Sequence, residues 1–465
     1  MTERKIYLLS PKKYSPEVIA VAFAKTSRSP LSFQEIADEL NDEASAEFHE
    51  KWVVGYGHAS VAEHAVLHIA IENVSRMAIE SIESNRLASY TEKSTRYQKW
   101  DSNAFVIPPE LDGHPLRETY EETVRMLFQT YADSLAPMRA LVMDRNPRRE
   151  NESDALWDRR IRSKYVDSCR FLLPAASLAN VGVTANARVL ESAIRKMLSH
   201  PLAEVREIGE KVKAVAKGET PTLVKYAEVV PYWQEVEKNF IAKGERAIAL
   251  AELTTLIDFD PDAETKILAA TLYRFGEMPY RQAAAHIQNA TPEQRAEFAE
   301  KLLGGMDKYD VPLRELEYSH YTFDLVMDQG AYFEFKRHRL MSQTPQALTT
   351  NLGYAIPKLI SEAGFEERYA NAMGAAAVAY QRLAEFNPQV ASYLVPNGFN
   401  RRVLATFNLR EAYHFVQLRA ARNAHFSIRR VARDVYAEIE NRHPLLAKYM
   451  RLPADVTWPD HFTSY

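Results

Sequence analysis

The order of apolar and polar residues predicts a chain that mixes strands with helices. Residues 65–75 and 321–327 alternate between apolar and polar side chains and are rich in branched or aromatic ones, which is typical of strands with one buried face. Four other stretches carry apolar residues at every third or fourth position, the spacing of an amphipathic helix. These stretches are residues 189–197, 202–215, 411–419 and 424–439.

Two shorter helices are predicted near the N-terminus, over residues 16–25 and 33–41. Ser15 can cap the first of them, and Pro16 suits its first helical position. Strands thus precede long helices in each half of the chain. This order predicts an α/β (α+β) fold in which each half forms a mixed or antiparallel sheet with long helices.

Short sequences of the first half return in the same order in the second half. The matched pairs are residues 84–89 with 337–342, 170–174 with 392–396, 186–188 with 408–410, and 221–226 with 444–449. Because four matches keep one order, they indicate an internal duplication. We therefore expect two tandem repeats, residues 1–245 and 246–465, packed across a pseudo-twofold axis.

The offset between matching residues falls from 253 to 222 along the chain, so the first repeat carries 31 extra residues. They are expected between Trp100 and Tyr165. Residues 146–154 are the best candidate, because this polar stretch lacks an apolar period and suits a surface excursion.

Composition excludes several classes of protein. The 465 residues include 58 Lys and Arg against 62 Asp and Glu, a formal charge of -4, so a basic surface for a nucleic-acid polymer is not expected. No run of about 18 apolar residues is present to span a membrane, and the charged N-terminus lacks the apolar core of a signal peptide, so a cytoplasmic location is expected. Cys169 is the single cysteine, which excludes disulfides and cysteine-built metal sites; we expect it to be buried and inert.

Residues 86–97 form the densest polar cluster, with hydroxyls, one carboxylate and two guanidinium groups. Arginine offers a planar fork of donors that suits phosphate, and serine hydroxyls can complete the shell around such an anion. Glu92 could accept a proton or a ring N–H. From composition alone, a solvated turn with surface ion pairs is the simpler explanation.

Two further stretches combine charge with histidine. Residues 57–64 hold two histidines and one glutamate, but not in the order H-E-x-x-H, so they favour hydrogen-bonding or core residues over a metal site. Residues 336–339 read Lys-Arg-His-Arg after an aromatic stretch, which suits either a solvated face or a clamp on a phosphorylated cofactor. No G-x-G-x-x-G or Walker lysine motif supports a Rossmann or P-loop site.

Together these elements resemble the flavin-dependent thymidylate synthases (ThyX), whose motif is R-H-R-x-x-S-x-N-E-x-S-x-R-Y. Residues 84–97 match that motif at Arg86, Ser89, Glu92, Ser94, Arg96 and Tyr97, and depart from it at Ser84, Asn85 and Thr91. Residues 57–64, the Arg170-x-Leu-Leu-Pro element and the Asn186-x-Arg188 element are similar to other elements of the family.

The second half departs from the motif in a complementary way. Its matching residues are Arg337, His338, Arg339, Ser342, Asn408, Arg410 and Arg419. Its replacements are Thr344, Pro345, Ala347, Thr349 and Ser392, and in the first half Lys196 or Met197 stands at the place of Arg419. The resemblance covers nearly the whole chain and implies a tandem form of the family.

The resemblance implies reductive methylation of dUMP to dTMP, in which methylene-tetrahydrofolate supplies the carbon and FAD reduced by NADPH supplies the hydride. It implies substrate-binding roles for Arg86, Glu92, Ser94, Arg96 and Arg170, and catalytic roles for Arg419 and His58. Cofactor-binding roles are implied for Ser60, Asn186, Arg188, Arg337, His338, Arg339, Asn408 and Arg410. No metal is implied.

Active sites of this family lie between subunits of a homotetramer. One chain would then equal two ordinary subunits, and a homodimer would form a pseudo-tetramer whose composite sites could draw on one chain or on both. Three other functions stay open on the sequence alone. They are an enzyme for another pyrimidine nucleotide or a hydroxymethyl product, a flavin- or nucleotide-binding protein without activity, and a scaffold whose arginines do not converge.

Overall fold

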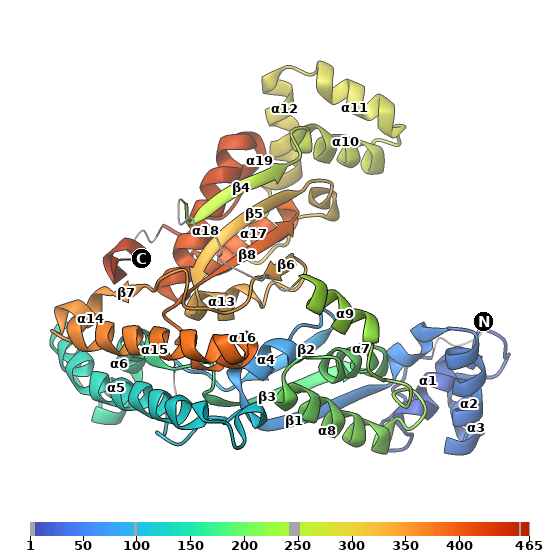
Figure 1. Cartoon of the computed structure of the whole chain (residues 1–465). Helices are drawn as coiled ribbons and strands as arrows, with labels where there is room; N and C mark the ends of the chain where they lie inside the picture. The colour runs from blue at the N-terminus through green and yellow to red at the C-terminus, as the bar shows by residue number, and fades with distance from the viewer. Residues whose placement is uncertain (1–4, 97–99, 241–251, 455–456, 465) are drawn as a thin grey trace.

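The computed structural model describes residues 5–96, 100–240, 252–454 and 457–464. Its elements form two lobes that meet along one side, the lower and the upper lobe of Figure 1. The lower lobe holds an antiparallel sheet in the order β1 (Val66–Ser75), β3 (Leu178–Asn186), β2 (Ala88–Glu92). The upper lobe holds an antiparallel sheet in the order β4 (Thr254–Phe259), β5 (Tyr321–Asp328), β8 (Asn400–Phe407), β6 (Ser342–Pro345). The short strands β7 (Ile356–Pro357) and β9 (Phe462–Ser464) pair separately.

Helices surround both sheets. Those of the first repeat are α1 (Pro16–Lys25), α2 (Phe33–Asp38), α3 (Asp42–Phe48), α4 (Arg76–Ile82), α5 (Leu116–Arg145), α6 (Asp154–Cys169), α7 (Ala187–Leu198), α8 (Ala203–Glu219) and α9 (Pro231–Phe240). Those of the second repeat are α10 (Ala263–Phe275), α11 (Tyr280–Asn289), α12 (Pro292–Ala299), α13 (Gln329–Phe335), α14 (Lys358–Glu362), α15 (Glu366–Phe386), α16 (Pro388–Ala391), α17 (Leu409–Arg419), α18 (Phe426–Arg442) and α19 (Pro444–Ala447). Short 3-10 turns relevant to the site are η2 (Ala59–His64), η4 (Arg170–Leu172), η6 (Arg314–Glu317) and η7 (Ser392–Leu394).

The predicted mixture of helices and antiparallel strands is confirmed, with small shifts at the ends of elements. Helix α1 has the predicted bounds, and the Ser15 side chain accepts a hydrogen bond from Val18 N in its first turn. The helix predicted over residues 33–41 is too long, because α2 ends at Asp38. The next helix, α3, needs Asn41 as its cap, and the side chain of Asn41 accepts from Ala44 N at 2.8 Å.

The two sheets repeat each other strand by strand. Ser89 lies opposite Thr184 in the lower sheet, and Ser342 lies opposite Thr406 in the upper one, which reproduces the sequence offsets of 253 and 222. Strand β4 extends only the upper sheet among the described residues. The common part of both sheets is therefore the unit β1-β3-β2, which corresponds to β5-β8-β6.

Side-chain contacts at the helix ends are repeated as well. Asn186 caps α7, and Asn408, its counterpart, caps α17. An ion pair between η2 and α7, Glu63–Arg188, returns between η6 and α17 as Glu317–Arg410. These contacts recur at equivalent places of the two repeats, which agrees with the internal duplication that the sequence indicates.

A pseudo-twofold axis passes between Pro174 and Pro396, which form an antiparallel bridge. On one side of this bridge Ala175 N donates to Val395 O at 3.0 Å, and on the other side Asn397 N donates to Leu173 O at 3.0 Å. Each bond is the image of the other, because the residues involved are related by the offset of 222. The two repeats of one chain thus pack as the sequence analysis predicts.

The extra length of the first repeat lies where it was predicted, between Trp100 and Tyr165, but more of it is helical than expected. Residues 146–153 connect α5 to α6. The helices themselves are also longer: α5 has 30 residues against 21 in α15, and α6 has 16 against 4 in α16. The polar stretch is therefore the tip of a longer helical hairpin.

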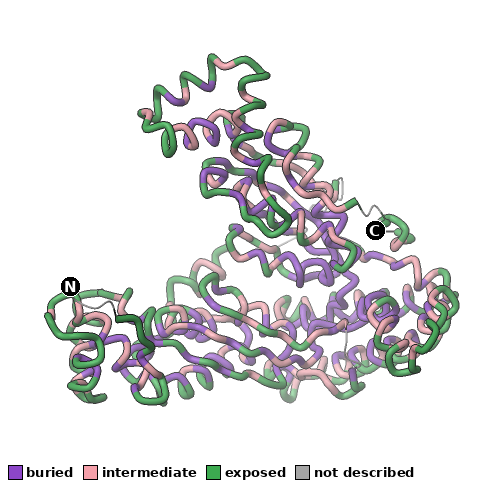
Figure 2. Tube along the Cα trace, turned by 180° about the vertical axis from the view of Figure 1, so that it is seen from behind, coloured by how far each residue is buried: buried purple, intermediate pink, exposed green. Residues whose placement is uncertain are grey.

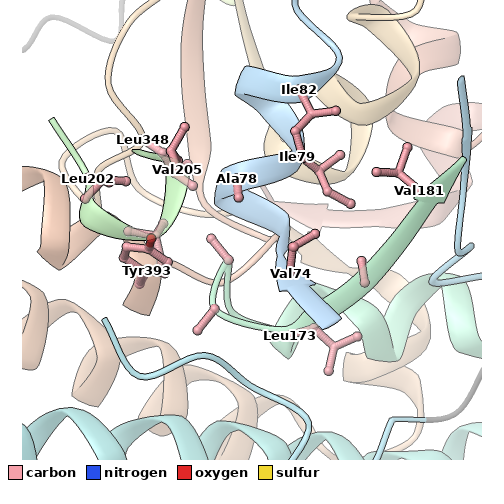
Figure 3. Packing of buried hydrophobic residues seen from close by; sticks show 14 of the residues in the cluster. Val74, Ala78, Ile79, Ile82, Leu173, Val181, Leu202, Val205, Leu348 and Tyr393 are labelled. Atoms are coloured by element: carbon pink, nitrogen blue, oxygen red, sulfur yellow. The ribbon is translucent and has the colours of Figure 1, made fainter. Parts of the chain in front are cut away.

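Buried residues run through the joint between the lobes, as the colouring of the chain trace in Figure 2 shows. The largest apolar cluster combines the first repeat with second-repeat residues such as Leu348, Tyr393 and Phe426, and Figure 3 shows part of it. Helix α15 lies beside α5 in Figure 1, so the core continues from one repeat into the other. The boundary proposed at residues 245 and 246 lies outside the described residues, and the division into 1–245 and 246–465 stays a prediction.

The substitution Gly398→Ala is expected to destabilise the fold beside the pseudo-twofold axis. A Cβ atom on Gly398 would lie 2.5 Å from the Tyr369 hydroxyl and 2.9 Å from Met373 Cε. That hydroxyl is held in place because it donates to Ala355 O at 2.8 Å. Overpacking of this kind costs about 1–3 kcal/mol of unfolding free energy, to be measured by urea denaturation. Gly374→Ala, which meets open space in α15, is the control; equal effects would contradict the prediction.

Candidate active site

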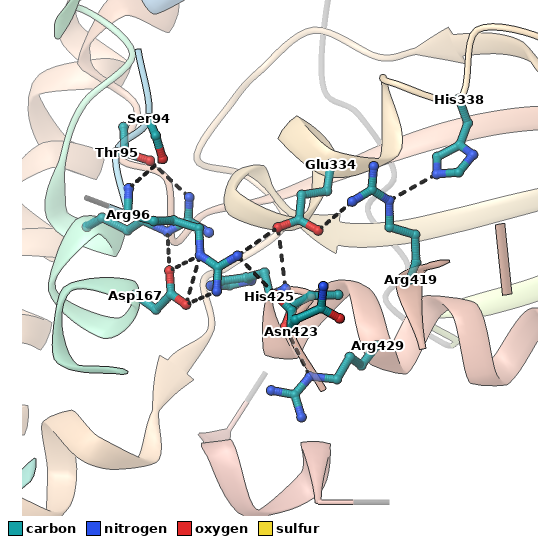
Figure 4. A network of polar contacts seen from close by, with 12 residues as sticks. Ser94, Thr95, Arg96, Asp167, Glu334, His338, Arg419, Asn423, His425 and Arg429 are labelled. Carbon is teal, nitrogen blue, oxygen red and sulfur yellow. Dashed lines mark hydrogen bonds and ion pairs between the residues drawn. The ribbon is translucent and has the colours of Figure 1, made fainter. Parts of the chain in front are cut away.

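Arg96 connects the two repeats at the centre of a polar network (Figure 4). It follows β2 and forms a two-pronged contact with Asp167 of α6, with Nε 2.8 Å from Oδ1 and Nη2 2.7 Å from Oδ2. Its Nη1 lies 3.7 Å from Glu334 Oε1 on α13 and donates to Asn423 O at 3.2 Å. A residue of the first repeat thus reaches α13 and the α17–α18 connection of the second repeat within one chain.

The second repeat continues the network from Glu334 into the interior. Glu334 Oε2 accepts from Arg419 Nη1 at 2.9 Å, and Arg419 Nε donates to His338 Nε2 at 3.0 Å. On the other side of the ring His338 Nδ1 lies 2.9 Å from Glu411 Oε1. Since arginine only donates, Nε2 must accept, so His338 is neutral with its proton on Nδ1. Burial, more than the positive charge of Arg419, lowers the pKa of His338 and agrees with this state.

Arg170 lies beside Arg96 and is almost fully buried. Its Nη1 donates to Thr95 Oγ1 at 2.9 Å, and its Nε lies 3.4 Å from Asp167 Oδ1. Its Nη2 is buried and makes no hydrogen bond among the described residues. A buried guanidinium with a donor to spare needs a partner such as a phosphate oxygen.

His425 closes the buried side of this cluster. It is fully buried, and its ring stacks on Phe171 with centroids 5.6 Å apart and tilts against Phe426 at 4.2 Å. Burial, reinforced by Arg170 and Arg96, lowers the pKa of His425 well below its usual value, so the ring is neutral. Gly330 lies against this cluster, and a Cβ on it would come within 2.9 Å of Asp328 Oδ1, which is too close, while it would only touch His425 Cε1 at 3.7 Å.

Glu92 takes part in a buried ion pair and is not exposed in an open binding site. Its Oε1 lies 3.0 Å from Arg76 Nη1, and both side chains are 3% exposed. The Arg76 guanidinium also lies over the Phe333 ring, 3.9 Å from its centroid. Burial raises the pKa of Glu92, but the charges of Arg76, Lys336 and Arg337 outweigh it and hold the pKa below its usual range.

A third group of cations lies where β2 and β6 approach each other. Arg86 Nη2 donates to Ser342 Oγ at 3.1 Å, and Arg339 Nε donates to Arg86 O at 3.2 Å. Arg337 is exposed and makes no ion pair within the described parts of the chain. Lys336 is buried and paired with Glu83 at 2.8 Å. This surface offers donors suited to a diphosphate.

The remaining residues predicted for the cofactor lie elsewhere. His58 and Ser60 line a pocket of about 770 Å³ whose described walls come from residues 23–64, including Arg28 and Trp52. Asn186 and Arg188 are engaged at the start of α7. Asn408 caps α17. Arg410 pairs with Glu317 and lines another pocket, of about 820 Å³. The structure therefore brings together Ser94, Arg96, Arg170, Arg419 and His338, and leaves His58 and Ser60 in a pocket that none of Arg337, His338 and Arg339 is found to line.

Sequence reasoning missed several residues of the network. They are Arg76, Asp167, Glu334, Glu411 and His425. Two of them had local signals in the sequence. Asp167 precedes Arg170 by one helical turn, and Glu334 lies within the aromatic stretch that comes just before residues 336–339. Tyr97 of the predicted motif lies outside the described residues.

Other chemistry receives no support from the described residues. No group of three or more potential metal ligands is found among them. Cys169 is buried, as predicted, and burial raises the pKa of its thiol to about 12. None of the described helices is both long and apolar enough to cross a bilayer.

Comparison with known proteins finds the same family in both halves of the chain. The family model described as "Thymidylate synthase complementing protein" matches residues 9–222 and 255–445, so it covers each repeat once. A "UPF0159 protein" of Chlamydia muridarum is 30% identical over 94% of this chain and 90% of that protein. The flavin-dependent thymidylate synthase of Clostridium tetani is 26% identical over 46% of this chain and 82% of that protein, and that of Pyrococcus furiosus is 28% identical over 44% and 74%. The chain belongs to the thymidylate synthase complementing protein family, as its motifs predict.

Stability is expected to fall in acid as Glu80 and Glu92 become protonated. Burial raises the pKa of each carboxyl, but Arg401 beside Glu80 and Arg76 beside Glu92 outweigh burial and hold both values below 4.5. A folded-state pKa below the unfolded one stabilises the protein above the unfolded pKa, and this gain is lost as the pH falls through the folded pKa. Urea midpoints should therefore drop between about pH 5 and about pH 3. A midpoint that stays constant over this range, or an equal drop in Glu92→Gln protein, would contradict the assignment.

Proposed function

We propose that the protein is a flavin-dependent thymidylate synthase that methylates dUMP to dTMP with methylene-tetrahydrofolate, using FAD reduced by NADPH. The observation that supports this most is the meeting of Arg96 and Arg170 from the first repeat with Glu334, His338 and Arg419 from the second. The family match supports a flavin enzyme of nucleotide metabolism. A scaffold would not require these buried charges to converge.

The phosphate of dUMP is proposed to bind Ser94, Arg96 and Arg170. In the structure the guanidinium groups of Arg96 and Arg170 both contact Asp167, so a bound phosphate dianion would share these two cations with that carboxylate. The unused Nη2 donor of Arg170 adds a direct contact for a phosphate oxygen. Glu92 lies behind this group and would act by fixing Arg76 rather than by touching the nucleotide.

Arg419 is proposed to act on the uracil ring. Its guanidinium is held from two sides by Glu334 and the neutral His338, so its direction is fixed before substrate binds. A fixed donor beside a ring oxygen stabilises the negative charge that develops there when carbon 5 becomes nucleophilic. Glu411 orients His338 and thereby Arg419, which makes it a positioning residue.

The arginines where β2 and β6 lie close together fit the cofactor that the family implies. Exposed Arg337, together with Arg86 and Arg339, offers donors for a diphosphate next to the Arg419 network. FAD bound there would supply the hydride, and the protein would supply position and charge. His58 and Ser60, which line the pocket near α1–α3, are proposed to contact the cofactor only across a homodimer that forms a pseudo-tetramer.

The activity is tested by release of tritium from carbon 5 of dUMP and by the colour of the purified protein. A yellow protein that is bleached by NADPH and releases tritium in the presence of methylene-tetrahydrofolate supports the proposal. A yellow protein that binds dUMP without release would instead indicate a binding protein. Release without dTMP formation would indicate another product, such as a hydroxymethyl nucleotide.

A mixture of Arg96→Ala and Arg337→Ala chains is expected to remain inactive. Arg96 meets the α13 segment of its own chain, so each chain of a mixed dimer would retain one defect in its own site. The measurement is tritium release after the two proteins are unfolded together, refolded and compared with wild type treated in the same way. Recovery of about a quarter or more of wild-type activity, as random mixing of complementary sites would give, would show that sites draw on different chains.

A further inference from the structure

The pseudo-twofold axis creates two equivalent places where the repeats meet, and their residues differ sharply. We call the cluster of Arg96, Asp167, Arg170, Glu334 and Arg419 the charged seam. The axis relates it to the cluster of Thr349, Gln389, Ser392, Ser81 and Met197, which we call the mirror seam. Each of these five charged residues aligns with an uncharged residue in the second cluster, and the cation Lys196 lies beside Met197.

The contacts that hold Arg170 show how the replacement works. In the charged seam Arg170 Nη1 donates to Thr95 Oγ1 at 2.9 Å. Leu348 stands at the place of Thr95 in the mirror seam, and Ser392 stands at the place of Arg170. Ser392 Oγ donates instead to the backbone oxygen of Leu348 at 2.8 Å, so the one donor of this side chain is not left for an anion.

Leu202 and Leu348, which belong to the apolar cluster of Figure 3, stand at the places of residues of the charged seam. Leu202 stands at the place of His425, and Leu202 and Leu348 are each 1% exposed. Lys196 Nζ donates to Asn85 Oδ1 at 2.9 Å, the contact that corresponds to Arg419 with His338. Lys196, rather than Met197, thus makes the contact of Arg419, but it is paired with an amide that carries no charge.

Glu204, a carboxylate of this core, already accepts three hydrogen bonds. It accepts from Ser75 N at 2.7 Å, from Ser75 Oγ at 2.6 Å and from the Tyr393 hydroxyl at 2.6 Å. The charged seam differs, because Arg170 Nη2 is buried without a hydrogen bond among the described residues. Buried donors that lack a partner indicate a place for a ligand, whereas satisfied groups indicate a structural core.

We propose that each chain binds one phosphate monoester, at the charged seam, and that the mirror seam is a closed core that binds none. The identity of that monoester as dUMP rests on the proposed function, but the count of one site per chain does not. Duplication gave the chain two equivalent seams; one retained its charges and the other now holds the repeats together.

The number of sites is tested by equilibrium dialysis of the full-length protein with dUMP and, separately, by titration with inorganic phosphate followed by ³¹P NMR. The expected result is one dUMP, and one phosphate in competition with it, for each chain. Two sites for each chain would overturn the proposal, and so would a lack of binding by both probes. Phosphate bound once without any binding of dUMP would overturn the proposed function and leave the single anion site standing.

Matched variants identify which seam binds. Arg170→Ala is expected to weaken binding about tenfold or more, because a hydrogen bond to a charged group is lost, whereas Ser392→Ala should leave affinity and stoichiometry unchanged. Leu348→Ala should lower the thermal midpoint of the protein and leave the dissociation constant unchanged, while Thr95→Ala should weaken binding. Loss of binding in Ser392→Ala protein that keeps the wild-type thermal midpoint would refute the assignment of the mirror seam.

Discussion

Arg96→Ala protein is expected to lose at least about 100-fold in kcat/KM for dTMP formation. This side chain contacts both Asp167 and Glu334. Its removal takes away a proposed hydrogen-bond donor to the substrate phosphate and leaves the negative charges of the two carboxylates less well compensated. Both effects weaken the binding of an anionic substrate. A donor lost from an enclosed site costs about 2.7–4 kcal/mol of transition-state stabilisation. The measurement is tritium release over a range of dUMP concentrations.

The control for this change is Arg117→Ala on α5, whose side chain is 41% exposed and pairs with Asp112 and Glu121. It should leave kcat/KM within about twofold, since exposed ion pairs contribute little. Unfolding midpoints of both variants separate loss of function from loss of the fold. A folded Arg96→Ala protein with near wild-type kcat/KM would refute the proposed place of the substrate phosphate.

Local patterns predict most of the fold because local physics decides it. Alternation over residues 65–75 and the cap at Ser15 depend on neighbours in the chain, and both elements form where predicted. The end of α2 depended on a competing signal, the cap at Asn41, that the apolar pattern does not contain. The extra helical length of α5 and α6 was missed because a polar connection is easier to see than a longer amphipathic helix.

The site is harder to predict because its partners come from distant parts of the chain. The two motif segments pointed to Arg96 and Arg419, and the structure joins them through Glu334. Nothing near Glu334 in the sequence reveals that it faces Arg96, which lies 238 positions earlier. His425 looked like part of a helix, and its burial against Phe171 depends on how the repeats pack.

The pseudo-twofold axis explains why complementary residues survive in the two repeats. A seam at the axis takes β2 and α6 from one repeat and α13 and α17 from the other. In the other seam the corresponding residues are uncharged, and apolar side chains such as Leu202 and Leu348 are buried there. Arg96 of the first repeat and Arg419 of the second belong to one network because both contact Glu334.

Glu80→Ala is expected to be the most destabilising of the single changes considered, by about 3–5 kcal/mol of unfolding free energy. Glu80 on α4 accepts from Arg401 Nη1 at 2.9 Å and 2.7 Å through its two oxygens, and it also accepts from Gln329. Arg401 lies on β8 of the other repeat, is 6% exposed at its side chain and lies over the Tyr332 ring. Removal of Glu80 would leave this guanidinium buried without a counter-charge.

A double variant distinguishes this pair from ordinary packing. Glu80→Leu combined with Arg401→Met removes both charges and keeps volume, so it should recover most of the loss, because a buried pair adds little over an apolar contact. Glu207→Ala, which breaks an exposed pair with Lys211, should cost less than about 1 kcal/mol. Urea denaturation measures all three proteins. If Glu80→Ala costs no more than Glu207→Ala, the pair does not hold the repeats together; if the double variant is as unstable as Glu80→Ala, the loss comes from packing and not from the uncompensated charge.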